Sequence, residues 1–179
     1  TGFNAEMAER HAAMAKTAAK AVETESFVSE FPDSSPTLPM YYEDVMQFDF
    51  DAEVIHCLPV IGGDVPENAT HALVLNATCF YPEGGGQEAD HGVIQNGSVS
   101  VNVLDTRKEN EIIFHLCDGE ISPGSKVHGM VDSARRRQLM DHHTAVHIVG
   151  GAARILLGPH IYQAGANKSV ESARLDITH

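Results

Sequence analysis

The sequence predicts an α+β fold, in which a small antiparallel β-barrel is followed by one long helix, with a further helix at the N-terminus. Three observations lead to this prediction. The first 22 residues are rich in alanine, which favours a helix. Short runs with alternating apolar and polar residues then follow one another, separated by turn-forming residues. Apolar residues recur at helical spacing after residue 132. We divide the chain into residues 1–41, a barrel domain at 42–131, and a C-terminal part at 132–179.

Residues 3–22 carry a narrow apolar stripe that is better suited to docking on a neighbouring domain than to building a core. Residues 23–41 contain three prolines and are typical of an irregular linker. The chain opens on Thr1 and not on methionine, so we expect it to be part of a longer protein.

Short strands are predicted through the middle of the chain, and Asn96-Gly97 predicts a tight hairpin because both central residues of a type I′ turn need a positive φ. Turn residues at 62–64 and 122–124 separate other runs. The expected strands are 44–50, 52–59, 71–80, 93–94 with 98–104, 111–117 and 126–131.

A long helix is predicted over residues 135–158. Asp132 or Ser133 can cap its N-terminus, and Gly158 followed by proline provides a stop. The pair Gly150-Gly151 inside it costs about 1 kcal/mol per glycine relative to alanine, so we expect a neighbouring element to pack closely there.

His143 and His147 are four residues apart, so a helix places both imidazoles on one face, an arrangement that suits a divalent metal. Packed and hydrogen-bonded histidines on a half-buried face are the alternative. A zinc protease would need glutamate at position 144, which is Thr144 here. A catalytic zinc site needs three protein ligands, and no recognisable spacing supplies the third. The other candidates stand singly: Cys57, Cys79, Cys117 and His179.

The formal net charge of -13 argues against broad nonspecific binding of nucleic acid. Basic residues gather in the last third of the chain, where they form either a face for phosphate or simply a solvated helix start. Three cysteines without paired spacing do not predict a disulfide framework, and no apolar run is long enough to cross a membrane. We therefore predict cytoplasmic localisation and no membrane partner. The basic residues are Arg135, Arg136, Arg137, Arg154, Lys168 and Arg174.

Gly84, Gly85 and Gly86 allow the backbone to approach a ligand or a neighbouring element closely, and their amides could bind an anion. A flexible hairpin tip is the alternative. No Gly-Lys-Ser or Gly-Lys-Thr follows, and the loop joins strands, so a phosphate loop and a dinucleotide fingerprint are both disfavoured.

Two motifs resemble the alanyl-tRNA synthetase family, in its archaeal form. Residues 136–165 resemble the start of the editing domain, whose signature is a helix with His-Thr-Ala-x-His, and residues 168–179 resemble the segment that follows. Residues 79–92, CFYPEGGGQEADHG, resemble the family's Phe-Tyr-Pro-Glu-Gly-Gly-Gly-Gln-x-x-Asp-x-Gly motif. The resemblance implies that 1–41 is the end of a linker, that the barrel is of the translation-factor type, and that 132–179 is the N-terminal part of a truncated editing domain.

The resemblance also implies roles for individual residues. His143 and His147 would be two of four Zn²⁺ ligands, the others coming from a later Cys-x-x-x-His segment that is absent here. Gln163 would lie near the bound aminoacyl group. Thr144 is the second candidate catalytic residue, and a structural role is the better expectation for it. The substrate-pocket loop would be Gly84, Gly85, Gly86 and Gln87, with Gln87 and Asp90 fixing its shape.

The function implied is ligation of alanine to tRNA(Ala) with ATP, together with zinc-dependent hydrolytic editing of Ser-tRNA(Ala) and Gly-tRNA(Ala). Such editing is needed because a small pocket rejects an added hydroxyl, or a smaller side chain, poorly. ATP and Mg²⁺ would bind only in the missing aminoacylation domain. The implied partners are tRNA(Ala) and the rest of the synthetase, and the residues present should hold zinc weakly and edit incompletely. Two alternatives stay open: a free-standing alanyl-tRNA editing protein, which residues 1–41 argue against, and a non-catalytic module that binds RNA or a partner.

Overall fold

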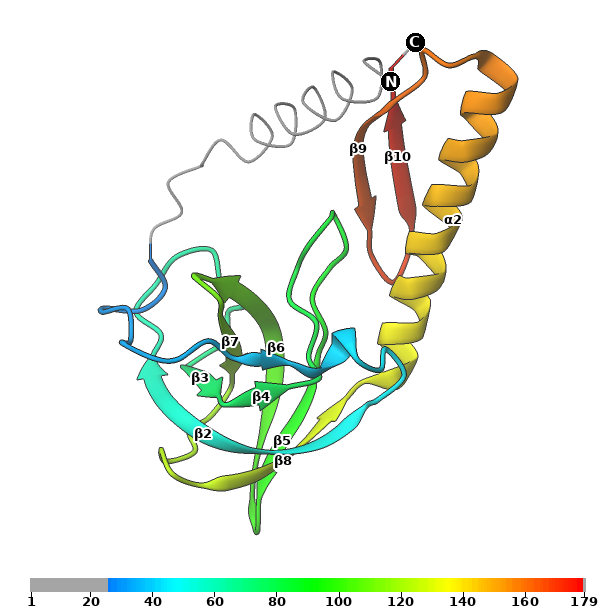
Figure 1. Cartoon of the computed structure of the whole chain (residues 1–179). Helices are drawn as coiled ribbons and strands as arrows, with labels where there is room; N and C mark the ends of the chain where they lie inside the picture. Colours follow the sequence, from blue (N-terminus) through cyan, green and yellow to red (C-terminus); the bar gives the residue numbers. More distant parts are fainter. Residues whose placement is uncertain (1–25, 179) are drawn as a thin grey trace.

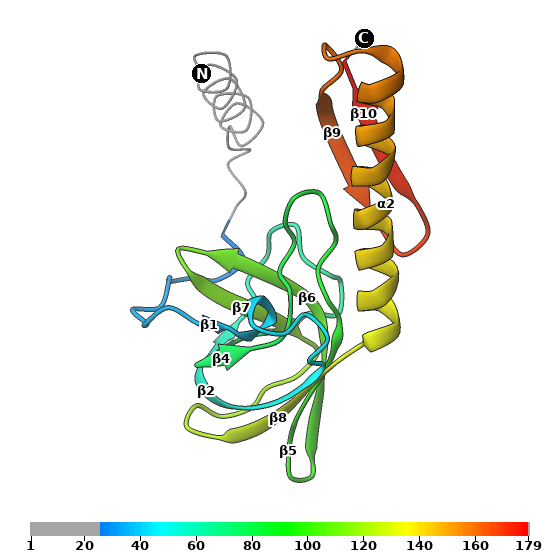
Figure 2. The same cartoon turned by 45° about the vertical axis from the view of Figure 1, so that its right-hand side comes forward.

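A computed structural model describes residues 26–178 and shows a closed barrel with a long helix and a two-stranded hairpin standing beside one end of it (Figures 1 and 2). The predicted α+β class is confirmed. The helix expected at residues 3–22 and the last residue, His179, lie outside the described residues.

Six antiparallel strands close the barrel in the order β2-β3-β7-β6-β5-β8. The hairpin predicted at Asn96-Gly97 joins β5 to β6, and Gly97 has a φ of 55°. Closure leaves no free sheet edge among these strands. Their bounds are β2 Asp49–Pro59, β3 His71–Leu75, β5 Gly92–Asn96, β6 Val99–Glu109, β7 Ile112–Cys117 and β8 Lys126–Val131.

The segment before the barrel differs from expectation. Strand 44–50 is wrong in its first part, because the Asp44 carboxylate accepts a hydrogen bond from the Met46 amide at 2.8 Å and holds a turn there. Ahead of this turn, β1 (Leu38–Pro39) pairs in parallel with β4 (Ala77–Thr78), and a 3-10 helix, η1 (Met40–Tyr42), follows.

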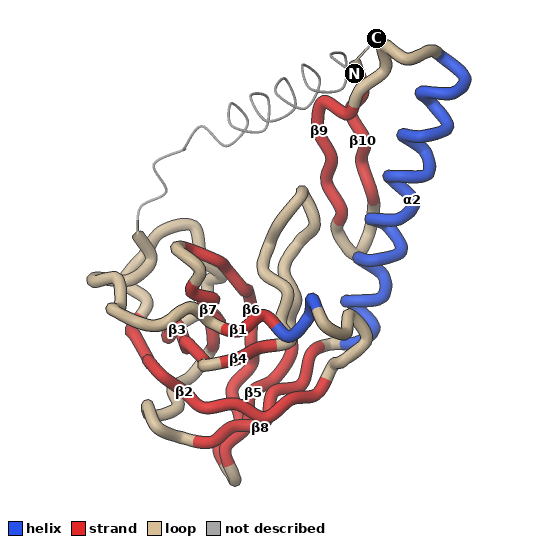
Figure 3. Tube along the Cα trace, in the orientation of Figure 1, coloured by secondary structure: helices blue, strands red, loops and turns tan. Residues whose placement is uncertain are grey.

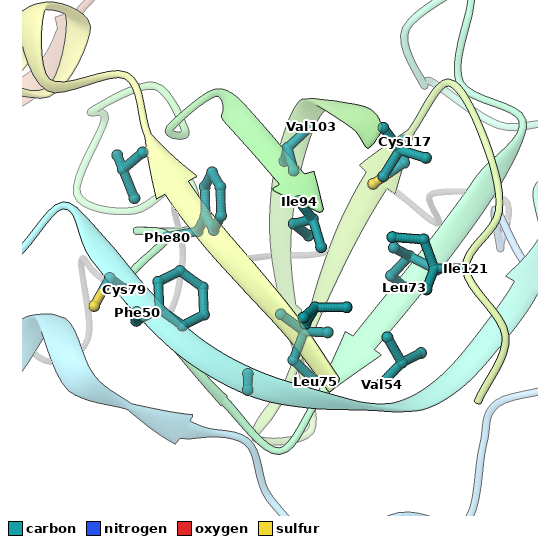
Figure 4. Packing of buried hydrophobic residues seen from close by; sticks show 14 residues of the cluster. Phe50, Val54, Leu73, Leu75, Cys79, Phe80, Ile94, Val103, Cys117 and Ile121 are labelled. Carbon is teal, nitrogen blue, oxygen red and sulfur yellow. The ribbon is translucent and has the colours of Figure 1, made fainter. Parts of the chain in front are cut away.

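The barrel interior is filled by apolar side chains from alternate positions of its strands (Figure 4). Phe50 and Phe80 meet edge to face with ring centroids 5.8 Å apart. A Cβ added at Gly129 would lie 2.4 Å from the Phe50 ring, so this strand needs a residue without a side chain there. Phe27 and Val28 of the linker cover a second, outer cluster, so this part of the linker is packed on the barrel.

Strand β7 is buried along its whole length because the linker covers its outer face. His115 lies at its centre, where Nδ1 donates to the Leu73 carbonyl at 3.0 Å and Nε2 lies 2.8 Å from the Thr78 hydroxyl. Burial lowers the pKa of His115 from 6.5 to about 4. This histidine is therefore a neutral core residue at physiological pH.

Helix α2 (Ser133–Leu157) follows β8 after a single residue, and runs alongside a hairpin of β9 (Gln163–Lys168) and β10 (Ala173–Ile177) (Figure 3). Its predicted cap is confirmed: the Asp132 carboxylate accepts from the amides of Ala134 and Arg135, both at 3.0 Å. Its C-cap is Gly158, with a φ of 118°.

Close packing was expected at Gly150 and Gly151, and this expectation is wrong. A Cβ at Gly150 would meet Leu175 at an ordinary 3.6 Å, and one at Gly151 would meet nothing within 4 Å among the described residues. No helix within residues 26–178 combines the length and the apolar character needed to cross a membrane.

Candidate active site

The glycine-rich loop is a tight two-residue turn. The amide of Gly84 donates to the Gln87 carbonyl at 3.1 Å, and the amide of Gln87 donates back to Gly84 at 3.0 Å. Between them, Gly85 and Gly86 have φ values of 60° and 74°. Both central residues therefore adopt the left-handed conformation of a type I′ turn, which glycine reaches without strain.

This turn is bonded to the end of β9 and is not a free hairpin tip. The Lys168 amide donates to the Gly86 carbonyl at 2.7 Å, and the Glu88 amide donates to the Lys168 carbonyl at 3.0 Å. A Cβ at Gly86 would lie 2.1 Å from the carbonyl oxygen of Ala166. The approach of these two backbones therefore requires glycine at position 86.

The side chain of Lys168 strengthens the same contact. It is buried, and its ammonium donates to the Gly85 carbonyl at 2.7 Å. Burial lowers the pKa of Lys168. For the basic residues of this part of the chain, a face for phosphate was one of two alternatives, and the charge of Lys168 is directed into the turn.

Gln87 joins the turn to helix α2. It is buried, and its side-chain oxygen lies 2.8 Å from Nδ1 of His143, which must donate because the amide oxygen can only accept. The proton on Nδ1 leaves Nε2 of His143 with a free lone pair, the form in which imidazole binds a metal. Burial first, and then the charges of Lys168 and His147, lower the pKa of His143, which favours this neutral form.

His143 and His147 lie on one face of α2, as the helical period predicts. Their rings stack with centroids 4.9 Å apart and an interplanar angle of 20°. His143 is half-buried beside the turn and His147 is exposed. Across residues 26–178, no cluster of three or more His, Cys, Asp or Glu side chains could hold a metal ion. The two imidazoles thus supply two nitrogen donors, without a third from the described chain.

Asp90 and Arg136 fix the base of α2 to the barrel. Nε of Arg136 donates to both carboxylate oxygens of Asp90 at 2.9 and 2.8 Å, and both residues are buried. Asp90 also accepts from the Tyr81 amide at 2.7 Å, and Arg136 donates to the Cys79 carbonyl at 2.6 Å. The guanidinium of Arg136 is therefore engaged by the buried carboxylate of Asp90 and is not available to a face for phosphate, one of the two alternatives left open by the sequence.

Beside this ion pair is a pocket of about 240 Å³ between η1, the glycine-rich turn and α2. Its lining is mostly aromatic and apolar, and it shares two residues with the histidine site. Our sequence interpretation missed it, although the adjacent tyrosines of η1 were a visible signal. Its principal lining residues are Tyr41, Tyr42, Tyr81, Met140, Gln87 and His143.

The two predicted catalytic residues are not brought together with this constellation. Thr144 is exposed on α2 and lies about 100° around the helix axis from His143. Gln163 is exposed at the start of β9, whereas Lys168 at the other end of that strand contacts the glycine-rich turn. Lys168 is five residue steps along the strand from Gln163, which places the two ends about 16 Å apart.

The family model of class II tRNA synthetases (A) matches residues 1–135. The alanine–tRNA ligase of Natronomonas pharaonis is 46% identical over 147 residues, which are 82% of this chain and 16% of that protein. That of Ignicoccus hospitalis is 43% identical over 144 residues, 80% of this chain and 15% of that protein. That of Methanopyrus kandleri is 39% identical over 178 residues, 99% of this chain and 19% of that protein.

The chain thus spans less than a fifth of the length of these curated relatives. The family model covers the barrel, the glycine-rich turn and the base of α2, and the match to the Methanopyrus protein continues through the helix and the hairpin. The resemblance drawn from the two motifs is confirmed, and the chain belongs to the family of class II tRNA synthetases (A).

Proposed function

We propose that this chain contributes to a zinc-dependent site that hydrolyses Ser-tRNA(Ala) and Gly-tRNA(Ala) within an alanyl-tRNA synthetase. The observation that carries the proposal is the hydrogen bond from His143 to Gln87, because it joins the two motifs of the resemblance in one place. A metal-binding histidine ordinarily donates its other ring N–H to a fixed oxygen acceptor, and the buried amide oxygen of Gln87 occupies that position for His143.

The residues present fit half of a zinc site. Zinc prefers nitrogen and sulfur donors, and His143 and His147 offer two imidazoles on one helical face. Among residues 26–178 no further donor joins them, so the remaining ligands must come from elsewhere. The chemistry that zinc supplies in such a site is orientation of the substrate amino group or activation of a water.

The chain's own residues position the reaction. Gln87 fixes the tautomer and ring direction of His143, and the turn at Gly85 and Gly86 brings backbone against β9 to close one wall of the site. Lys168 holds the tip of that turn through the Gly85 carbonyl. If both histidines bind zinc, neither is available as a general base. The resemblance implies that Gln163 lies near the aminoacyl group, but Gln163 is at the end of β9 away from the glycine-rich turn, so we give it no contact in this site. Thr144 keeps a structural role.

The whole protein to which this chain belongs would ligate alanine to tRNA(Ala), since its relatives are named alanine–tRNA ligases. ATP and Mg²⁺ would serve its aminoacylation domain, and the partners of the present residues would be tRNA(Ala) and the rest of the synthetase. We propose the cytoplasm as its compartment.

The test uses the intact synthetase, with bound zinc measured by mass spectrometry and hydrolysis of Ser-tRNA(Ala) measured directly. His143→Ala and His147→Ala should each lose zinc and hydrolysis while alanylation continues, and Gln87→Ala should weaken zinc affinity about 10- to 100-fold. His128→Ala, which removes a barrel histidine paired with Asp51, is the matched control and should change neither.

Retention of zinc and hydrolysis by both histidine variants would overturn the proposal. Hydrolysis without alanylation in the intact protein would instead identify a free-standing editing protein. Binding of tRNA without zinc or hydrolysis would identify a non-catalytic module.

A further inference from the structure

We propose that the pocket lined by Tyr41, Tyr42 and Tyr81 receives the base of the 3′-terminal nucleoside of aminoacyl-tRNA, and so places its ester at the histidine site. This inference rests on the proposed function, because it names how the substrate of that site would be gripped. We call this cavity the tyrosine pocket.

The tyrosine pocket has the surface that nucleic-acid bases require. The ring of Tyr41 is 3% exposed and contacts both neighbours, with centroids 4.7 Å from Tyr42 and 5.2 Å from Tyr81. Tyr42 is 72% exposed although it is a large aromatic residue. Bases stack on exposed aromatic rings with little regard to sequence, and this stacking is a main source of affinity for single strands.

The charge of the pocket favours a neutral group over a phosphate. Arg136 is the cationic side chain in the lining, and its guanidinium is engaged by Asp90 and by the Cys79 and Val45 carbonyls. The pair is buried and neutral in sum, so little positive field is left for an anion. A planar, uncharged heterocycle is the part of a nucleotide that this environment accepts.

The size of the pocket agrees with this part of the ligand. About 240 Å³ is below the 300 to 1,000 Å³ of pockets that enclose drug-sized ligands. A base can enter, while its ribose must remain at the mouth. The cavity therefore accepts the base of a nucleoside and leaves its sugar at the mouth.

Position connects the pocket to the chemistry. Gln87 and His143 line it, and the same two side chains form the hydrogen bond at the candidate zinc site. In aminoacyl-tRNA only the ribose separates the terminal base from the ester. A base in the tyrosine pocket would thus bind the substrate with that ester beside His143.

The first test uses the 179-residue chain with ¹³C-labelled tyrosine rings, because three of its four tyrosines line the pocket. Adenosine should shift the signals of Tyr42 and Tyr81 and leave that of Tyr162 unchanged, and ribose at the same concentrations should shift none. Tyr42→Ala should weaken adenosine binding at least about 5-fold, whereas Tyr42→Trp should retain it. Leu38→Ala, an exposed apolar change outside the pocket, should have no effect.

Equal shifts with ribose and adenosine, or unchanged affinity in Tyr42→Ala, would overturn the inference. In the intact synthetase, Tyr42→Ala should raise the KM for hydrolysis of Ser-tRNA(Ala) at least about 5-fold with kcat unchanged. An unchanged KM would also overturn it, while the zinc-dependent hydrolysis itself would stand. Conversely, adenosine binding at Tyr42 in a protein that never hydrolyses Ser-tRNA(Ala) would reject the editing function and keep the pocket.

Discussion

The barrel and the C-terminal unit of helix and hairpin are held by different forces. Most of the buried apolar side chains belong to the barrel and the linker that covers it. Helix α2 has 25 residues, of which only Arg136, Leu139 and Val146 are buried. Large apolar side chains on its second half stay exposed: Ile148, Val149, Ile155, Leu156 and Leu157.

This difference separates stability from orientation. The barrel is stabilised by apolar burial, which is large but has little directional preference. The helix and hairpin are oriented by a few polar contacts with the barrel, chiefly those of Asp90, Gln87 and the glycine-rich turn. The candidate site lies where these contacts are, so its geometry depends on hydrogen bonds whose loss the barrel core can survive.

The largest effect is expected for Asp90→Asn. This change leaves the buried guanidinium of Arg136 without its counter-charge, and the loss of one partner of a buried pair costs about 3 to 5 kcal/mol. Urea unfolding of the purified chain measures this cost. Glu53→Gln is the matched control, because it breaks an exposed pair with Lys126 and should cost less than about 1 kcal/mol. Equal costs for both would show that the Asp90 pair is not what holds the helix.

The second prediction concerns the barrel and states how its free energy of unfolding depends on pH through His115. Because the folded pKa of His115 is about 4, below its ordinary 6.5, the unfolded chain binds more protons between these values. Stability contributed by the neutral histidine is present above pH 6.5 and falls as pH decreases. Between pH 6.5 and 4.5 the loss should be about 2 to 3 kcal/mol. His115→Gln should lack this component in urea titrations at the two pH values, and an identical pH slope in both proteins would contradict the assignment.

The third prediction tests the contact between the two regions. Gly86→Ala should cost about 2 kcal/mol, from left-handed strain and from the clash with Ala166 that disrupts the bonds to Lys168. Gly97 has a similar positive φ, and a Cβ there would meet no atom of residues 26–178 within 4 Å, so Gly97→Ala measures the strain alone. Hydrogen exchange of the Lys168 amide should accelerate in Gly86→Ala only. Unchanged protection there would show that the turn does not hold β9.

The smallest effect is expected for Leu156→Ala on helix α2. This leucine is 82% exposed, so its truncation should change the unfolding free energy by less than about 0.5 kcal/mol. Leu73→Ala in the barrel, at 0% exposure, should cost about 2 to 5 kcal/mol in the same assay. A large cost at Leu156 would show that this face is covered in solution, and would remove the contrast between the regions.

Local patterns in the sequence predicted much of the barrel and of α2. The alternating runs expected as strands at 71–80 and 98–104 contain β3 and the first part of β6. The Asp132 cap and the Asn96-Gly97 hairpin follow from short-range backbone chemistry. The helical period also placed His143 and His147 on one face.

Local patterns could not predict contacts between residues that lie far apart in the sequence. The partner of Arg136 is 46 residues away, so an exposed basic face was the natural interpretation of its arginine-rich surroundings. The tyrosine pocket depends on Tyr81 meeting the tyrosines of η1, which no local period encodes. A close approach was expected both at Gly150-Gly151 and at the glycine-rich loop, and it occurs at Gly86, where the backbone of β9 lies against the turn.

The direct passage from β8 into α2 also sets the rotational phase of the helix. One residue, Asp132, separates the two elements, so no flexible spacer can absorb a change in length. An insertion of one residue at this junction would turn the helix by about 100°. His143 would then face away from Gln87, and an intact barrel would carry its imidazole pair on the wrong side.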